Sequence, residues 1–186
     1  MILGRPTCRP WLLLPLCAAA CLVPTRAVAY EDAWLLEAGL GGTAMEPDLL
    51  GPSEQGLLGA ALSLGAARGL DDAWSVRLRA EWTPLFQGAG PLLETGAIGL
   101  DFLYAIDLLE VVPYAGLGAG AMLLTASTGD ARLLPTVRLA LGLDWLLGWS
   151  HVLGLEVVAR MARGAPSGRW STAWGMLLRW GLRLES

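Results

Sequence analysis

The 186-residue chain is long enough for one domain, with little left over for a second. Its 54% hydrophobic content, 16% charged content and mean hydropathy of +0.51 are unusual for a soluble enzyme of this size, and its 24 glycines disfavour a mostly helical protein, because each interior glycine weakens a helix by about 1 kcal/mol relative to alanine. All 13 basic residues are arginine and the net charge is −4 without a basic patch, which disfavours nucleic-acid binding.

Residues 1–29 have the pattern of a secretory signal peptide. Arg5 and Arg9 precede an apolar stretch, Trp11–Val23, and the segment ends in a small-x-small cleavage motif at Ala27–Ala29. The apolar stretch has 13 residues, whereas a helix needs roughly 20 to span a bilayer. We predict export and cleavage before Tyr30, with residues 30–186 as one mature domain. An alternative is a lipoprotein that is acylated on Cys21.

All three cysteines, Cys8, Cys17 and Cys21, lie inside this predicted signal peptide. The mature domain therefore has no disulfide and no cysteine-based metal site, which suits passage through an oxidising bacterial periplasm. Its ten arginines and 17 acids give a net charge of −7. His151 is the single histidine, which excludes a site with several histidine ligands, and we predict neither metal nor cofactor.

The segment Ala73–Thr83 alternates between apolar and polar residues with a period of two. One face carries Trp74, Val76, Leu78, Ala80 and Trp82, and the other carries Ser75, Arg77, Arg79, Glu81 and Thr83. A strand places all the charges on one side, whereas a helix would spread them around its circumference. The two tryptophans lie roughly 20 Å apart on a tilted strand, close to the height of an apolar band between two aromatic girdles.

Eight such segments follow one another along the mature chain. They are Trp34–Gly42, Leu57–Ala67, Ala73–Thr83, Leu92–Tyr104, Val111–Leu124, Pro135–Leu146, His151–Ala162 and Ser171–Arg183. An even number of strands with this pattern predicts an all-β fold, an eight-stranded antiparallel up-and-down transmembrane β-barrel. We therefore predict that residues 30–186 form one outer-membrane β-barrel domain.

The predicted connections alternate between long and short. The long ones are Thr43–Gly56, Pro84–Pro91, Thr125–Leu134 and Arg163–Trp170. This order suits a barrel with short periplasmic turns and longer outer loops, provided that the N-terminus starts on the inside.

The pattern resembles small outer-membrane β-barrel proteins of the OmpA-transmembrane-domain, OmpX and OmpW type. The resemblance is carried by the signal peptide, the strand Pro113–Gly120 and the strand end Gly142–Trp145. Such barrels usually end in an aromatic residue. Here the last aromatic residue is Trp180, and the sequence ends in Leu184, Glu185 and Ser186, which departs from the type. The resemblance implies a bacterial outer-membrane location, outer-membrane lipid as surroundings, and assembly by periplasmic chaperones and the barrel-assembly machinery. It specifies no surface partner.

The inward faces of the predicted strands are rich in charge. We predict a network of ion pairs in the lumen, formed by Glu37, Arg77, Arg79, Glu81, Asp101, Arg138, Asp144, Glu156, Arg160, Arg179 and Arg183. Eight strands enclose an interior that side chains just fill, which favours a polar plug over the alternatives, a gated ion path or a binding pocket. The inward glycines Gly39, Gly41, Gly116, Gly118 and Gly120 would make room for large neighbours or, alternatively, open a small cavity.

The tryptophans at the strand ends predict an aromatic girdle that consists of Trp34, Trp74, Trp82, Trp145, Trp174 and Trp180. We predict a non-enzymatic barrel with a structural or surface-interaction role. The first alternative is a narrow barrel that transports small apolar molecules. A lipid-modifying barrel enzyme is less favoured, because Ser150 and His151 are adjacent and would face opposite sides of a strand. A soluble lipocalin-like barrel, with its apolar rows inside, is a further alternative.

Overall fold

The computed structural model describes residues 33–46, 56–86, 93–106, 110–126, 129–163 and 170–185. The predicted signal peptide and large parts of the predicted long connections lie outside these residues. No helix that could cross a membrane is present in the described part of the chain.

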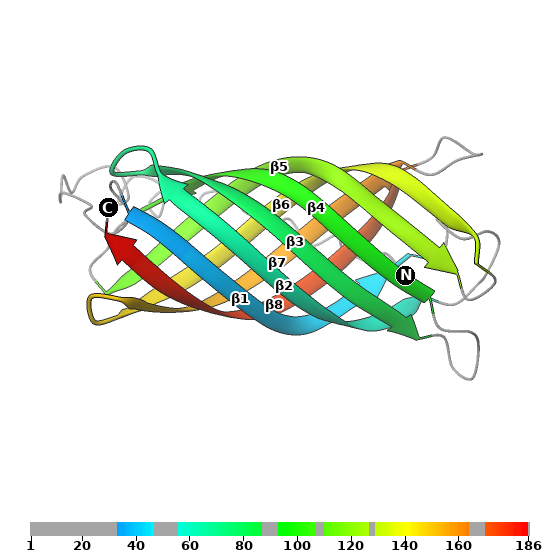
Figure 1. Ribbon diagram of the computed structural model, residues 1–186, viewed down its shortest axis with the longest axis horizontal. Coiled ribbons are helices and arrows are strands. Elements are labelled where there is room, and N and C mark those ends of the chain that lie inside the picture. The colour runs from blue at the N-terminus through cyan, green and yellow to red at the C-terminus, as the bar shows by residue number, and fades with distance from the viewer. Residues whose placement is uncertain are drawn as a thin grey trace, which may run out of the picture.

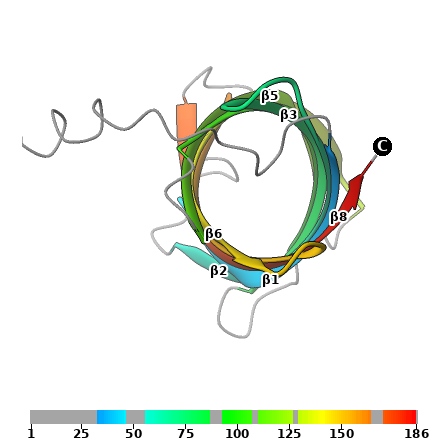
Figure 2. The same cartoon turned by 90° about the vertical axis from the view of Figure 1, so that its left-hand side faces the viewer.

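The chain forms a closed barrel of eight antiparallel strands (Figures 1 and 2). The strands are β1 (Ala33–Met45), β2 (Leu57–Gly69), β3 (Trp74–Phe86), β4 (Leu93–Ala105), β5 (Val111–Ala126), β6 (Ala131–Leu147), β7 (His151–Arg163) and β8 (Trp170–Glu185). Each strand pairs with the next, and β1 closes the barrel against β8. This confirms the predicted up-and-down fold.

The two ends of the barrel differ in their connections. At one end, which we call the turn end, residues 70–73, 106–110 and 148–150 join the strands. The Asp71 Oδ1 atom accepts hydrogen bonds from the backbone N–H groups of Ala73 (2.9 Å) and Trp74 (2.7 Å), and Gly148 has a φ of +75°. The opposite end, which we call the loop end, carries the connections 46–56, 87–92, 127–130 and 164–169.

The predicted long loop at Thr125–Leu134 is wrong. Strand β5 continues to Ala126, β6 begins at Ala131, and Thr125 pairs with Ala131 across the hairpin. Gly129 has a φ of +90°, a conformation that glycine adopts without strain and that allows a short connection. The connection between β5 and β6 therefore spans only residues 127–130, and the connections do not alternate strictly between long and short.

Exposure alternates along the strands and shows which rows point outward. Leu78 is 52% exposed and Leu100 is 44% exposed, whereas their neighbours Arg77 and Asp101 are 0% and 2% exposed. Because the side-chain period of a strand is two, the whole apolar row faces outward and the charged row faces the lumen. The lipocalin-like alternative, with apolar rows inside, is wrong.

The lumen is polar only in its middle, a feature that was not predicted from the sequence. An apolar layer closes the loop end and consists of Met45, Leu57, Leu85, Leu93, Met122, Leu124, Leu134, Ala162 and Ala173. A second layer closes the turn end and consists of Leu35, Ala67, Leu103, Ala105, Val112, Tyr114 and Val152. Both layers bury apolar area inside the barrel and separate the charged middle from the two openings.

Candidate functional site

Between the two apolar layers lies a group of eight charged side chains, which we call the ion-pair cluster. It consists of Glu37 (β1), Arg77 and Arg79 (β3), Asp101 (β4), Arg138 and Asp144 (β6), Glu156 (β7) and Arg179 (β8). All eight are buried. Four guanidinium groups face four carboxylates, so the charges within the cluster balance. Balance matters because an isolated charge in such an interior is strongly unfavourable.

Glu156 is the centre of the cluster. Its carboxylate lies 2.8 Å from Arg77 Nη1, 2.7 Å from Arg79 Nη1 and 2.5 Å from Arg138 Nη2. The residue is fully buried. Because Arg77 and Arg79 belong to β3 and Glu156 to β7, these contacts cross the lumen and tie opposite walls of the barrel together.

Glu37 forms a second centre near the turn end. Its Oε1 atom lies 3.3 Å from Arg79 Nη2 and 3.4 Å from Arg77 Nη1, and its Oε2 atom pairs with Arg179. Arg179 also contacts Asp144, with 2.5 Å between Nη2 and Oδ1. Arg179 therefore links carboxylates from two strands, as the planar fork of an arginine allows.

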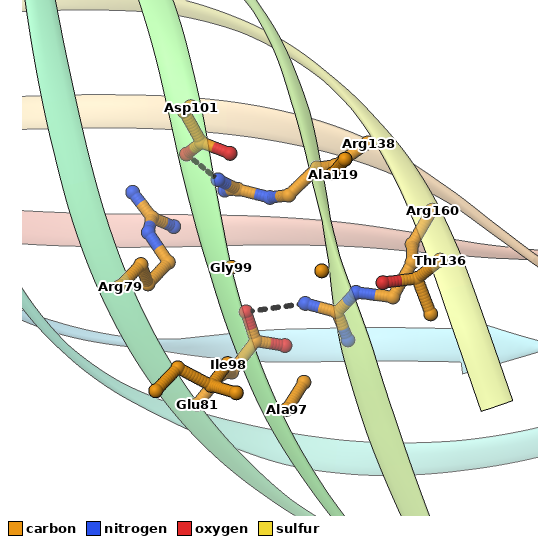
Figure 3. Close-up of a pocket in the computed structure, with 11 residues that line it drawn as sticks. Arg79, Glu81, Ala97, Ile98, Gly99, Asp101, Ala119, Thr136, Arg138 and Arg160 are labelled. Atoms are coloured by element: carbon orange, nitrogen blue, oxygen red, sulfur yellow. Dashed lines mark hydrogen bonds and ion pairs between the residues drawn. The ribbon is translucent and has the colours of Figure 1, made fainter. Parts of the chain in front are cut away.

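Asp101 completes the cluster through a cross-strand pair. It lies directly opposite Arg77 in the register of β3 and β4, and its Oδ2 atom accepts hydrogen bonds from Arg77 Nε (3.1 Å) and Nη2 (2.9 Å). Arg138 of β6, two strands away, donates to the same oxygen (Figure 3).

The other three residues of the predicted network are Glu81, Arg160 and Arg183. Glu81 and Arg160 form their own ion pair, 2.7 Å between Oε2 and Nη2, on the loop side of the cluster (Figure 3). Arg183 is partly buried on the inward face of β8, close to the turn end.

Tyr114 belongs to the site but was not predicted from the sequence. Its hydroxyl group donates a 2.6 Å hydrogen bond to Glu156 Oε2, and its ring lies under two guanidinium groups, 5.0 Å from Arg179 Cζ and 5.9 Å from Arg77 Cζ. The signal was present, because Tyr114 shares the inward row of β5 with Gly116 and Gly118. A buried tyrosine hydroxyl usually has a hydrogen-bond partner, and because the glycines beside Tyr114 have no side chains, that partner is expected on another strand.

Replacing Tyr114 by phenylalanine is expected to lower the free energy of unfolding by about 1.5–3 kcal/mol, the range for a hydrogen bond to a charged group. Chemical unfolding in detergent micelles measures the change. Tyr104→Phe is the matched control, because Tyr104 is 43% exposed on the outward face of β4. Equal stability of the two variants would contradict a role for the Tyr114 hydroxyl group.

Glycines on neighbouring strands leave the space that the side chains of the ion-pair cluster occupy. A Cβ atom on Gly65 would lie 2.6 Å from Glu37 Oε1, one on Gly118 would overlap Asp101, and one on Gly154 would overlap Asp144. The inward glycines named from the sequence divide into two kinds, because Gly39, Gly116 and Gly118 face neighbouring side chains whereas Gly41 and Gly120 face the backbone of the adjacent strand. They serve packing and close strand approach, and the side chains that they admit fill the space.

Gly118→Ala is expected to lower the free energy of unfolding by about 1–3 kcal/mol, because the added methyl group forces Asp101 away from its two arginines. Gly96→Ala on β4 is the control, since a Cβ there has no atom within 4 Å. Unfolding midpoints in one detergent compare the two. A Gly118 variant as stable as the Gly96 variant would show that the space is not needed.

The space that remains inside the barrel is small. One cavity of about 20 Å³ lies between the cluster and the Glu81–Arg160 pair, and its lining includes Arg79, Asp101 and Arg138 (Figure 3). A second cavity, also of about 20 Å³, lies beside Tyr114 at the turn end. Each has room for about one water molecule. Among the described residues, the interior is therefore packed with side chains rather than hollow.

The six predicted girdle tryptophans all lie on the outward face. Trp34, Trp74, Trp145 and Trp180 are near the turn end, and Trp82 and Trp174 are toward the loop end. Trp74 contacts Tyr104, with 5.0 Å between ring centroids, and Trp180 stacks on His151 at 5.6 Å. The described part of the chain contains no group of three or more His, Cys, Asp or Glu side chains that is arranged to hold a metal ion.

Comparisons with known proteins identify the fold. No protein-family model and no curated protein sequence matches the chain. Among solved structures, neisserial surface protein A is 12% identical with a TM-score of 0.64, and the match covers 84% of this chain and all of that one. OprG of Pseudomonas aeruginosa is 16% identical with a TM-score of 0.56 (84% and 98% covered), and the outer membrane enzyme PagL is 15% identical with a TM-score of 0.50 (78% and 97% covered). At these identities the likeness establishes that the chain has the fold of small eight-stranded outer-membrane barrels.

Proposed function

We propose that this protein is a non-enzymatic barrel of the bacterial outer membrane, with a structural or surface-interaction role and a closed lumen. The observation that carries the proposal is the interior itself. A charge-balanced cluster of four arginines and four carboxylates lies between two apolar layers, and the cavities beside it measure only about 20 Å³. Such an interior stiffens the barrel and, within the described residues, leaves no continuous path for solute or ions.

The outward surface supports the membrane location. On the outward faces of the described strands, charged side chains lie only at the strand ends: Arg68 at the turn end, and Glu94 and Arg163 at the loop end. The rows between them are apolar, with tryptophans near both borders, which is the pattern of a lipid-facing belt. Outer-membrane lipid is thus the proposed surroundings, and periplasmic chaperones with the barrel-assembly machinery are the proposed route of insertion.

The transport alternative and the enzymatic alternative have less support. An apolar solute would have to cross the charged middle of the lumen. The fold alone admits an enzyme, as PagL illustrates. His151 does lie on the outward face, but the ring that it contacts is Trp180, and Ser150 precedes it within the turn. Incubation with lipid A or phospholipid, with and without His151→Ala, tests the enzymatic alternative directly, since turnover by the wild type would overturn the proposal.

Membrane fractionation followed by bilayer recording tests the proposal on one sample. We expect the protein in the outer-membrane fraction, with heat-modifiable migration on gels after detergent extraction, and no stepwise conductance in planar bilayers. Purification as a soluble periplasmic monomer without detergent would refute the membrane location. Regular conductance steps would refute the closed lumen while leaving the location intact.

A further inference from the structure

The pairing between β2 and β3 is interrupted near the loop end. Two pairs are missing from the register there, Ala60 with Pro84 and Ala61 with Thr83, although the same register continues on both sides of them. Between every other two neighbouring strands, the register of the described residues runs without such a gap. We call this interruption of the barrel wall the seam gap.

Pro84 is the physical cause of the seam gap. Its carbonyl oxygen points toward β2, because a Cβ atom built on Gly59 would lie 2.4 Å from it. In an antiparallel pair the N–H and C=O groups of one residue face the same neighbour, so the nitrogen of Pro84 also faces β2, opposite Ala60. Proline has no N–H group, and the carbonyl group of Ala60 therefore has no donor opposite it on β3.

The side chains at the seam gap are small and leave it unbridged. Ala60 is exposed on the outward face, whereas Ala61 and Thr83 are buried on the inward face. The hydroxyl group of Thr83 donates to Glu81 Oε1 of its own strand (3.5 Å), and the carbonyl group of Thr83 accepts from Thr95 Oγ1 of β4 (3.4 Å). Both bonds hold Thr83 to β3 and β4, so neither of them replaces the missing bond to β2.

Polar groups lie directly behind the seam gap. Along β3, Thr83 stands between Glu81, which pairs with Arg160, and Leu85, which belongs to the apolar layer at the loop end. A cavity of about 10 Å³ is lined by Ala61, Glu81 and Arg160, and the cavity of about 20 Å³ borders the same ion pair (Figure 3). Each cavity is close to the size of one water molecule. The seam gap is thus a side entrance that bypasses the apolar layer.

We propose that the barrel wall opens locally at the seam gap and that this opening admits water to the Glu81–Arg160 ion pair. The inference rests on the proposed membrane location and deepens the proposed closed lumen. Water enters only the loop half of the lumen, because the ion-pair cluster and the apolar layer at the turn end remain closed behind it.

The chemistry of the seam gap selects water as the occupant. A backbone carbonyl without a donor is strongly unfavourable in apolar surroundings, and a water molecule in the gap donates the bond that Pro84 cannot. Pro84 lies two residues beyond Trp82, at the aromatic border where the hydrated headgroup region begins. The two small cavities have no room for a larger solute.

Hydrogen exchange in D₂O, followed by NMR, tests the proposal. The barrel is labelled with ¹⁵N and inserted into phospholipid nanodiscs, and Pro84→Val restores the N–H group opposite Ala60. We expect this variant to slow exchange of the Ala60 amide and of the Arg160 Nε–H group by about fivefold to tenfold, the effect of one added backbone hydrogen bond. The Nε–H group of Arg77, which is fully buried and donates to Asp101, should exchange at an unchanged rate.

Pro135→Val is the matched control. Pro135 is exposed on the outward face of β6 at the loop end, but the β5–β6 register is continuous there and the β6–β7 register begins only at Thr136. Its replacement closes no gap, so exchange at Ala60 and Arg160 should stay as in the wild type. If Pro84→Val loses the heat-modifiable gel shift, Pro84→Ala replaces it, since alanine restores the same N–H group.

Three outcomes contradict the proposal. Equal exchange of the Ala60 amide in the wild type and in Pro84→Val shows that the wall is closed at the seam gap. Slower exchange at Ala60 with unchanged exchange at Arg160 shows that water reaches the ion pair by another route. Equal slowing by Pro135→Val assigns the effect to overall stability. A failure of the proposed function is seen separately, as a soluble protein in the fractionation or as conductance steps in the bilayer.

Discussion

Glu156→Ala is expected to lower the free energy of unfolding of the barrel by about 3–5 kcal/mol, the cost of leaving a buried charge without its partner. Three guanidinium groups, from Arg77, Arg79 and Arg138, lie within 2.8 Å of this one carboxylate. Without it, four buried arginines face three carboxylates, and water has little room to compensate. Unfolding by guanidinium chloride in micelles, followed by the gel shift of the folded barrel, measures the loss.

Two controls test whether the loss of stability comes from the buried charge of Glu156 rather than from the removal of any glutamate. Glu94→Ala removes an exposed carboxylate at the loop end of β4 and should leave the midpoint unchanged within about 0.5 kcal/mol. The second control combines Glu156→Gln with Arg138→Met, which restores the charge balance. The double variant should lose less stability than the sum of the two single variants. Strict additivity would contradict the view that charge balance holds the cluster together.

Leu78→Arg is expected to destabilise the barrel in lipid vesicles by about 2–4 kcal/mol, the cost of an arginine at the bilayer midplane on the lipid-facing side of a barrel. Leu78 lies midway between Trp74 and Trp82 on the outward face of β3 and is 52% exposed. An arginine there would have to leave water for hydrocarbon. Unfolding of the vesicle-inserted barrel, compared with the wild type, measures the cost.

Leu70→Arg is the matched control for position in the membrane. Leu70 is 57% exposed, nearly the same as Leu78, but it lies in the short connection 70–73 at the turn end. In lipid, Leu70→Arg should cost about 0–1 kcal/mol, as arginines near the interface do. If both leucines faced water, both substitutions would be nearly neutral. Equal, small effects of the two arginines would therefore contradict the membrane-spanning belt.

The strand pattern was predictable because it is local. Alternation such as that around Leu78 depends only on the period of two of an extended chain, so it is visible without knowing which strands pair. It predicted eight strands, the outward apolar rows and the inward charges at positions such as Arg77 and Asp101. It failed at the hairpin between Thr125 and Ala131, because the same turn-forming residues suit a long loop and a tight turn.

The two apolar layers inside the barrel could not be predicted from the strand pattern either. Leu85 on β3 belongs to the inward row, yet it is as apolar as its outward neighbour Phe86. At this end of β3 both faces are apolar, since the outward face meets the lipid-facing belt and the inward face closes the barrel. The alternation disappears there, and only the closed barrel shows which apolar residues point inward.

Taken by itself, the amino-acid sequence determined the composition of the lumen, namely arginines and carboxylates in near balance with glycines beside them. The tertiary structure decided the pairing. Glu156 meets Arg79 across the lumen, 77 positions apart in sequence, and Arg179 meets Glu37 because β8 closes on β1. Contacts of this kind depend on the register and curvature of all eight strands together, and no pattern within one strand encodes them. For the same reason Tyr114 was recognisable as an inward residue from the sequence, but its bond to Glu156 appeared only in the folded barrel.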